Sequence, residues 1–213
     1  ALENDQRTNF KYYISLIKIK QIFIFTFFYS NKDYNSYIIK ICLFFLYFQL
    51  NFLINTTFFN DSTMHQIYED GGSFNFIYNI PNIIYSSIIS SFLYAFIRKL
   101  TLTSKNVLEI KHEKKKHNLN ARVIIALKQI KKKFICFFAF NIIFLLIIWY
   151  YISCFCAVYK NTQVYLIKNT AISYSISLIY PFIISFIPCF FRIFAFKGSG
   201  ICLYRISQMI QFM

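Results

Sequence analysis

FICFFAFNIIFLLIIWYYISCFCAVY, residues 134–159, is a run of 26 residues without a formal charge. Lys131, Lys132 and Lys133 come directly before this run, and Lys160 follows it. At a rise of about 1.5 Å per residue, a helix of this length crosses a hydrocarbon core of about 30 Å. The stretch therefore predicts a tilted transmembrane helix and indicates that the chain is a membrane protein.

Three further uncharged windows are long enough to cross a bilayer, at about residues 41–59, 74–97 and 169–191. Hydrophobic residues make up 57% of the 213, with only 4 Gly and 3 Pro, which excludes a disordered or linker-rich chain. We therefore expect an all-α, polytopic integral membrane protein with four transmembrane helices in two hairpins. A single membrane domain, 38–213, would follow a cytosolic or interfacial segment, 1–37.

The basic residues are distributed unevenly between the two sides of the predicted membrane domain. If residues 1–40, 98–133 and 192–213 share one side, that side holds all 23 lysines and arginines except Lys160 and Lys168. Loops rich in lysine and arginine favour the cytosolic side. We therefore expect both termini and the linker in the cytosol of a plasma or ciliary membrane, or in the matrix at a mitochondrial inner membrane.

The basic linker, 98–133, predicts contact with a charged membrane surface. Its second part, 121–133, has the pattern of an amphipathic helix, with Val123 and Leu127 on its apolar face. Anionic headgroups attract each nearby basic residue by about 1 kcal/mol. No aromatic stacking platform accompanies the charge, so we expect no nucleic-acid partner. The lysines expected at the headgroups are Lys114, Lys115, Lys116, Lys131, Lys132 and Lys133.

The N-terminal stretch 12–30 is apolar and aromatic but is interrupted by Lys18 and Lys20, and its uncharged remainder is too short to span. Two interpretations are open. The stretch lies in the membrane interface, with its lysines at the headgroups, or it packs on the protein itself. The chain begins at Ala1 without a signal-peptide pattern, so we expect a processed chain or a piece of a longer protein.

The loop after the first span carries the one polar constellation that suggests chemistry. Asp61, His65 and Glu69 are spaced i, i+4, i+8 in a short predicted helix capped by Asp61 or Ser62 and ended by Gly71. On one helix face they would form a weak cation site of carboxylates and one imidazole. The other interpretation is a solvated acidic loop without a metal. Because the other short loop supplies no second polar cluster, we expect neither an enzyme nor a cofactor.

Two N-x-S/T glycosylation sequons, at Asn55 and Asn60, fall at the outer end of the first span. Asn60 is the better candidate because it lies farther from the predicted bilayer boundary. Its modification would identify the outer side of the membrane and a secretory route.

Small polar residues recur at helical spacing in the second and fourth spans. Such residues let helix backbones approach closely, and their hydroxyls bond across the contact. We expect helix packing through these serines, whereas a channel would place them along a lumen. The set comprises Ser86, Ser87, Ser90, Ser91, Ser173 and Ser177.

The segments IIKICLFF, IPNIIYSSIISSFLYAFIRKL, WYYISCFCAVYKN and ISYSISLIYPFIISFIPCFF follow one another within about residues 38–195. Their order, with Trp149 and the Pro181 to Pro188 helix, resembles the membrane hairpins of the large receptor-like polycystin family. The resemblance implies a large extracellular region and a location at the cell surface or cilium. The chain lacks that family's lipase-type β-sandwich and channel half, so the resemblance does not extend to ion conduction.

We therefore expect the membrane anchor and signalling module of a larger polycystin-like protein. The abundance of Phe, Ile, Tyr, Asn and Lys is typical of an AT-rich genome, which favours a protist source. One alternative is a subunit of an oligomeric ion channel or transporter. Another is an accessory membrane subunit of an organellar respiratory complex, in which Asn60 is unglycosylated and partner subunits cover the aromatic outer faces.

Overall fold

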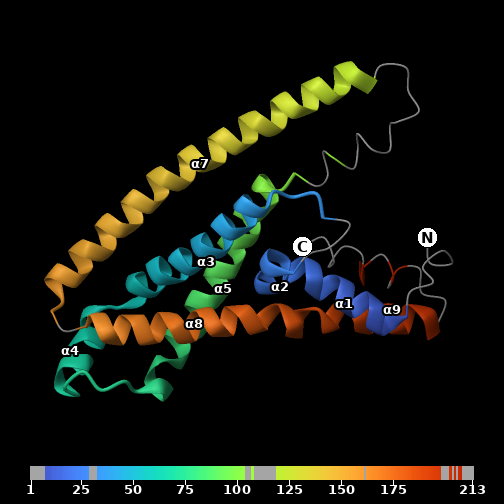
Figure 1. Cartoon of the computed structure of the whole chain (residues 1–213). Coiled ribbons are helices and arrows are strands. Elements are labelled where there is room, and N and C mark those ends of the chain that lie inside the picture. Colours follow the sequence, from blue (N-terminus) through green and yellow to red (C-terminus); the bar gives the residue numbers. More distant parts are fainter. Residues whose placement is uncertain are drawn as a thin grey trace. The chain divides into compact units, whose positions relative to one another are not determined.

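The computed structural model describes residues 8–28, 33–103, 107, 119–160, 162–197, 202, 204, 206 and 207, and the regular elements in them are all α-helices (Figure 1). They are α1 (Asn9–Lys20), α2 (Ile22–Phe27), α3 (Tyr37–Phe58), α4 (Asp61–Glu69), α5 (Phe76–Thr101), α7 (Leu119–Val158), α8 (Gln163–Ile184) and α9 (Phe186–Lys197). Among the described residues, four stretches are long and apolar enough to cross a membrane: Tyr37–Phe58, Phe76–Thr101, Val123–Val158 and Gln163–Phe196. The predicted all-α, polytopic membrane fold is confirmed.

The chain divides into two compact units. The first comprises Ala1–Tyr29 with Ile176–Met213, and therefore contains α1, α2, α9 and the end of α8. The second is Ser30–Ser175, with α3, α4, α5, α7 and the beginning of α8. The sequence-based division at residue 37 stays a prediction.

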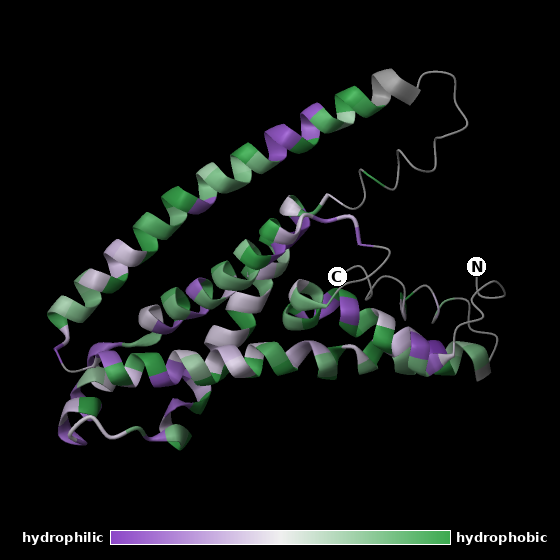
Figure 2. Cartoon of the chain, viewed as in Figure 1, coloured by the Kyte–Doolittle hydropathy of each residue, from purple (hydrophilic) through white to green (hydrophobic). Residues whose placement is uncertain are grey.

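The third span is part of a longer helix than the uncharged run predicts. α7 continues without a break from Leu119 through Lys131, Lys132 and Lys133 to Val158. No Gly or Pro interrupts these residues, and lysine is a good helix former. The amphipathic linker helix and the third span are therefore one helix, with its hydrophilic residues gathered near its beginning (Figure 2).

The fourth span is interrupted where α8 ends and α9 begins. Pro188 has no N–H to donate to the carbonyl of Ile184, the residue four positions earlier and the last residue of α8. Ser185, in the gap, donates both its backbone N–H (3.1 Å) and its hydroxyl (2.6 Å) to the carbonyl oxygen of Pro181. The proline therefore leaves the Ile184 carbonyl without its helical donor and ends α8, whereas the Pro181 carbonyl accepts both hydrogen bonds from Ser185.

Helix α4 begins one or two residues earlier than its predicted caps, Asp61 or Ser62, imply. Asn60, rather than Asp61 or Ser62, is the N-cap, because its Oδ1 accepts a hydrogen bond from the Thr63 N–H at 2.9 Å. Gly71 and Gly72 follow the helix with φ of 60° and 80°, which only glycine adopts readily. The Gly72 N–H donates to the Ile67 carbonyl at 2.8 Å and closes the turn.

Within the second unit, α3 and α5 pack most closely. The Tyr47 and Tyr94 rings lie 4.5 Å apart, and the Tyr47 hydroxyl bonds to the Ser91 hydroxyl at 2.6 Å. α3 also contributes the fully buried side chains of Leu43, Leu46 and Leu50. This hairpin provides the frame on which the other helices of the unit pack.

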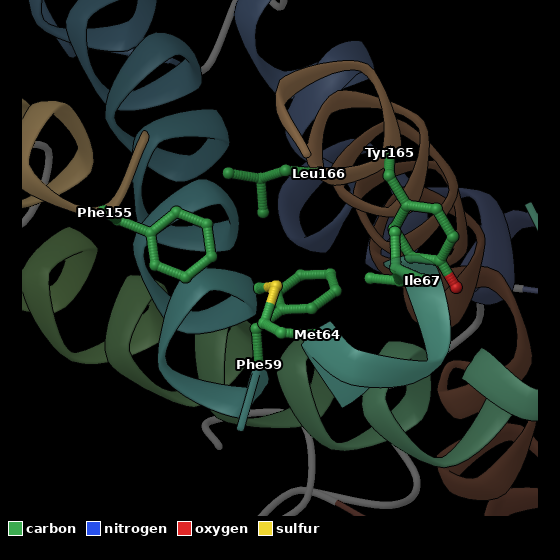
Figure 3. Packing of buried hydrophobic residues seen from close by; sticks show 6 residues of the cluster. All are labelled: Phe59, Met64, Ile67, Phe155, Tyr165 and Leu166. Atoms are coloured by element: carbon green, nitrogen blue, oxygen red, sulfur yellow. The ribbon is translucent and has the colours of Figure 1, made fainter. Parts of the chain in front are cut away.

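A hydrophobic cluster joins α4 to the ends of α3, α7 and α8 (Figure 3). In the close-up, side chains from these four segments point toward a common centre. The cluster fixes the end of α7 in the unit, since Phe155 is its contribution. Its members are Phe59, Met64, Ile67, Phe155, Tyr165 and Leu166.

Within the first unit, α1 packs on α9. The Arg192 guanidinium lies 4.8 Å from the centroids of both the Tyr12 and the Phe196 rings, and its Nη1 donates to Asn9 Oδ1 at 2.8 Å. Tyr13 stacks on Phe186 with centroids 4.6 Å apart. These contacts lie within the protein, and the position of this N-terminal stretch relative to the membrane stays a prediction.

Candidate functional site

A buried polar network links α3, α5 and α8 inside the second unit. We call this network the polar ladder. Its members are polar residues of the three helices that are each at most 4% exposed and are joined by hydrogen bonds. Since the bilayer core supplies no water, polar groups at this depth have to be satisfied by the protein. The ladder residues are Asn51, Asn55, Asn79, Ser86, Tyr165, Asn169 and Ser173.

Helix α8 supplies one side of the ladder from a single face. Tyr165, Asn169 and Ser173 are spaced i, i+4, i+8, so their side chains lie along one stripe. Asn169 Nδ2 donates to Asn55 Oδ1 of α3 at 2.9 Å. Tyr165 accepts a hydrogen bond from Asn79 Nδ2 of α5. One stripe of α8 therefore binds both helices of the α3–α5 hairpin.

Ser173 forms the most highly connected step of the ladder. Its hydroxyl bonds to that of Ser86 at 2.8 Å and donates to Asn51 Oδ1 at 3.3 Å. The Ile83 carbonyl lies 3.4 Å away as a further acceptor. A single small side chain therefore contacts α3 and α5 together, and a larger residue here would separate the three helices.

The two asparagines of α3 are oriented by their own helix. Asn51 Nδ2 donates to the Tyr47 carbonyl at 2.9 Å, and Asn55 Nδ2 donates to the Asn51 carbonyl at 2.8 Å. Their Oδ1 atoms remain available as acceptors toward α8. Asn51 pairs with Ser173 and Asn55 with Asn169. A step of four residues toward the C-terminus on α3 therefore corresponds to a step of four residues toward the N-terminus on α8. The ladder thus fixes an antiparallel register.

Two acceptors of the ladder are incompletely satisfied. Asn79 Oδ1 and Asn169 Oδ1 are buried and have no hydrogen-bond partner within the part of the chain that the structure describes. The ladder contains amides and hydroxyls but no carboxylate, imidazole or amine. Its chemistry is therefore that of orientation and packing, and it offers no group that would exchange a proton near neutral pH.

The structure brings two of the six predicted packing serines together, Ser86 and Ser173. The Ser91 hydroxyl bonds to the Tyr47 hydroxyl, and the Ser87 hydroxyl donates to the Ile84 carbonyl of its own helix. Ser90 and Ser177 are also buried, at 0% and 1% exposed.

Sequence reasoning missed the asparagines and Tyr165, which carry most of the ladder. Asn51 and Asn55 are four residues apart inside an apolar span, and Asn169 lies four residues from Tyr165 and from Ser173. That spacing was the signal that could have identified them.

The predicted cation ligands are not gathered into one group. His65 Nε2 lies 3.1 Å from Glu69 Oε1, but Asp61 Oδ1 instead accepts a hydrogen bond from the Tyr159 hydroxyl at 2.9 Å. No three His, Cys, Asp or Glu residues are placed to hold a metal ion within the described ranges. The bond from Tyr159 to the Asp61 carboxylate, together with its charge, raises the pKa of the Tyr159 phenol.

The two sequons differ in access. Asn55 is 0% exposed and belongs to the polar ladder, whereas Asn60 is exposed at the beginning of α4. An enzyme that glycosylates this loop would therefore reach Asn60 and not Asn55.

The predicted headgroup lysines fall into three classes. Lys114, Lys115 and Lys116 lie outside the described residues. Lys131 and Lys132 are exposed on α7. Lys133 is half-buried, and its Nζ donates to the Leu102 carbonyl at 2.7 Å, so it ties α7 to the end of α5.

A second polar group lies where α3 begins. Lys40 forms an ion pair with Asp33, and their side chains are 7% and 14% exposed. Asn35 Oδ1 accepts a hydrogen bond from the Thr103 N–H at 2.9 Å. Burial alone would raise the pKa of Asp33, but hydrogen bonds from Lys40 and Asn35 and the Lys40 charge outweigh it and hold that pKa below its usual value.

Comparisons with family models, with curated proteins and with solved structures find no match for this chain.

Proposed function

We propose that the chain is the membrane anchor and signalling module of a larger cell-surface or ciliary protein, of the kind that its resemblance to the polycystins implies. The observation that carries the proposal is the polar ladder. Ser173 and Ser86 bond to each other between α8 and α5 and are fully buried. An anchor needs helices held in one fixed register, and buried interhelical hydrogen bonds supply that.

The burial of the serines also favours an anchor over a channel or transporter subunit. A conduction path needs polar side chains along a lumen. Ser86, Ser90 and Ser173 are each 0% exposed in the single chain. They therefore act in packing within the subunit, where the channel alternative requires them at an aqueous surface.

The proposal includes an orientation, a membrane and a set of surface contacts. Both termini face the cytosol of a plasma or ciliary membrane of a protist, and α4 faces the outside. The exposed Lys131 and Lys132, together with Lys114, Lys115 and Lys116, meet anionic headgroups. The uneven distribution of basic residues supports this orientation.

The test is glycosylation of the α4 loop in eukaryotic cells, with matched variants that remove one sequon each. Ser62→Ala removes the Asn60 sequon, and Thr57→Ala removes the Asn55 sequon without touching either asparagine. We expect glycosidase treatment to change the mobility of the reference protein and of Thr57→Ala, but not of Ser62→Ala. The intact mass of the native protein, measured on the same sample, should exceed that of these 213 residues.

Two results would contradict the proposal. One is an unglycosylated Asn60 in a short native chain that co-purifies with respiratory subunits, which would assign the protein to an organelle. The other is a glycan that depends on Thr57 and not on Ser62, which would contradict the burial of Asn55.

A further inference from the structure

One face of α7 borders a shallow, open groove of about 730 Å³ that runs from the lysine-bearing part of the helix to its uncharged part, and all of the residues that line it belong to α7. Lys131 is the single charged residue among those that line it. The remaining lining is apolar and includes Leu127, Ile135 and Ile142, each 60% exposed. The groove therefore combines one amine with a continuous apolar surface.

The length of the apolar part matches one leaflet of a bilayer. From Lys131 to Ile142 the helix advances about 16 Å, at about 1.5 Å per residue. Half of a hydrocarbon core of about 30 Å is about 15 Å. With Lys131 at the headgroup level, the groove floor at Phe134 and Phe138 follows the course of an acyl chain toward the midplane.

The neighbouring lysines are placed differently. Lys133 donates to the Leu102 carbonyl, and Lys132 is exposed but does not line the groove. Of these three lysines, Lys131 alone therefore lines the groove, where it lies between Ile130 and Phe134. A cation there complements a lipid phosphate, and a stem of four methylenes lets the amine reach the headgroup region.

We propose that this groove is a binding site for one anionic phospholipid of the leaflet on the lysine side. The Lys131 ammonium contacts the phosphate, and an acyl chain lies along Phe134, Phe138 and Ile142. The inference rests on the transmembrane course of α7 and on the headgroup contact proposed above for Lys131, but not on the role of the chain as an anchor. It assigns α7 a lipid preference in addition to its role as a span.

The experiment measures lipid contact at the groove with a fluorescent reporter. Trp149 is the only tryptophan of the chain, so Trp149→Phe combined with Phe138→Trp gives one reporter at the groove floor. In bilayers that contain brominated phosphatidylserine or brominated phosphatidylcholine, quenching reports which lipid lies against it. We expect about a fivefold preference for the anionic lipid.

Lys131→Gln and Lys132→Gln are the matched pair, because both remove one charge from adjacent positions. We expect Lys131→Gln to bring the preference close to one and Lys132→Gln to retain it. Equal loss in both variants would overturn the site, since only general charge would then matter, and absence of any preference in the reference protein would overturn it too.

A second measurement avoids the tryptophan substitutions. Native mass spectrometry of the chain with only Lys131→Gln or Lys132→Gln should show retained phosphatidylserine lost in the first and kept in the second. Equal retention in the two variants would contradict the proposal, and neither result bears on the glycosylation test of the anchor.

Discussion

α3 and α7 are both apolar enough to cross a membrane, but they are held in the protein in different ways. In its most apolar window, 39% of α3 is buried, compared with 22% of the more apolar α7. α3 has polar contacts along its length, from the Lys40–Asp33 ion pair through Asn51 to Asn55. Apolarity therefore shows that a helix can span the membrane. Buried amides and ion pairs show which span fixes the positions of the neighbouring helices.

α7 is tied mainly at its two ends. Near its beginning, Lys133 donates to the Leu102 carbonyl. Toward its end, Phe155 enters the cluster beneath α4, and Trp149 stacks on Phe52 with ring centroids 6.5 Å apart. Between the ties half of the large apolar side chains are exposed, with Leu146 at 68% and Ile147 at 61%, whereas Ile148 is fully buried. Such a helix is suited to lipid contact along its middle.

Of the changes that test this difference between α3 and α7, we expect the largest loss of unfolding free energy from breaking the ion pair at the beginning of α3. Asp33→Asn would remove the carboxylate that pairs with the buried Lys40 ammonium, and we expect the free energy of unfolding to fall by about 3 kcal/mol. Equilibrium unfolding in mixed micelles, followed by Trp149 fluorescence, measures this. Asp70→Asn, at an exposed carboxylate, is the control and should change little. A similar loss in both variants would show that the ion pair stabilises the fold no more than an exposed carboxylate does.

The same pair predicts a pH dependence. The folded state lowers the pKa of Asp33 below its ordinary value of 3.8, so ionised Asp33 stabilises the fold above that pH. The stabilisation should be lost as pH falls below about 4 and through the folded-state pKa. Unfolding curves between neutral and acidic pH should therefore show a steeper acid loss in the reference protein than in Asp33→Asn. Parallel pH profiles would contradict the assignment.

A matched pair of leucines tests burial itself. Leu50 of α3 is 1% exposed and Leu146 of α7 is 68% exposed. We expect Leu50→Ala to cost about 2 kcal/mol by leaving a cavity, and Leu146→Ala to cost little because lipid or detergent replaces the lost contacts. Both are measured by the same unfolding experiment. Equal costs would mean that the middle of α7 is covered by protein in the folded state.

The four spans were predictable because they are long and uncharged, but their ends were not. Lys40, Arg98 and the Lys131 to Lys133 run all lie inside helices, since charge marks where the bilayer ends and not where the helix ends. The break between α8 and α9 lies where Pro188 lacks an N–H for the Ile184 carbonyl, but proline alone does not predict it, because Pro81 and Pro181 lie inside α5 and α8.

The candidate site was only partly predictable. Serines were expected in packing, whereas the asparagines within the spans were not considered as packing residues. Asn51 gains its role from Ser173, which is 122 residues away, and no local pattern supplies that pairing. Likewise, the spacing of Asp61 and His65 suggested a shared site, but Tyr159 from the end of α7 takes the Asp61 carboxylate.

A double-mutant cycle tests whether the ladder couples α3 to α8. Asn55→Leu and Asn169→Leu each remove one side of a buried amide pair and keep a similar volume. We expect a coupling of about 1 kcal/mol, the range measured for hydrogen bonds between membrane helices. The double variant should therefore lose less unfolding free energy than the sum of the losses in the two single variants. Strict additivity would show that the pair does not join the helices.

The smallest expected effect lies at the end of α7, where Tyr159 meets Asp61. The carboxylate accepts the phenol hydrogen bond and disfavours the negative phenolate, so Asp61→Asn should lower the pKa of Tyr159 toward its ordinary value of 10.0. Alkaline titration of tyrosine absorbance, with Tyr159→Phe as the reference for the signal, measures the change. His65→Gln should leave it unaltered, since His65 pairs with Glu69. If His65→Gln also lowers the pKa of Tyr159, His65 and Asp61 act on it together. The end of α7 would then contact one shared polar cluster instead of the Asp61 carboxylate alone.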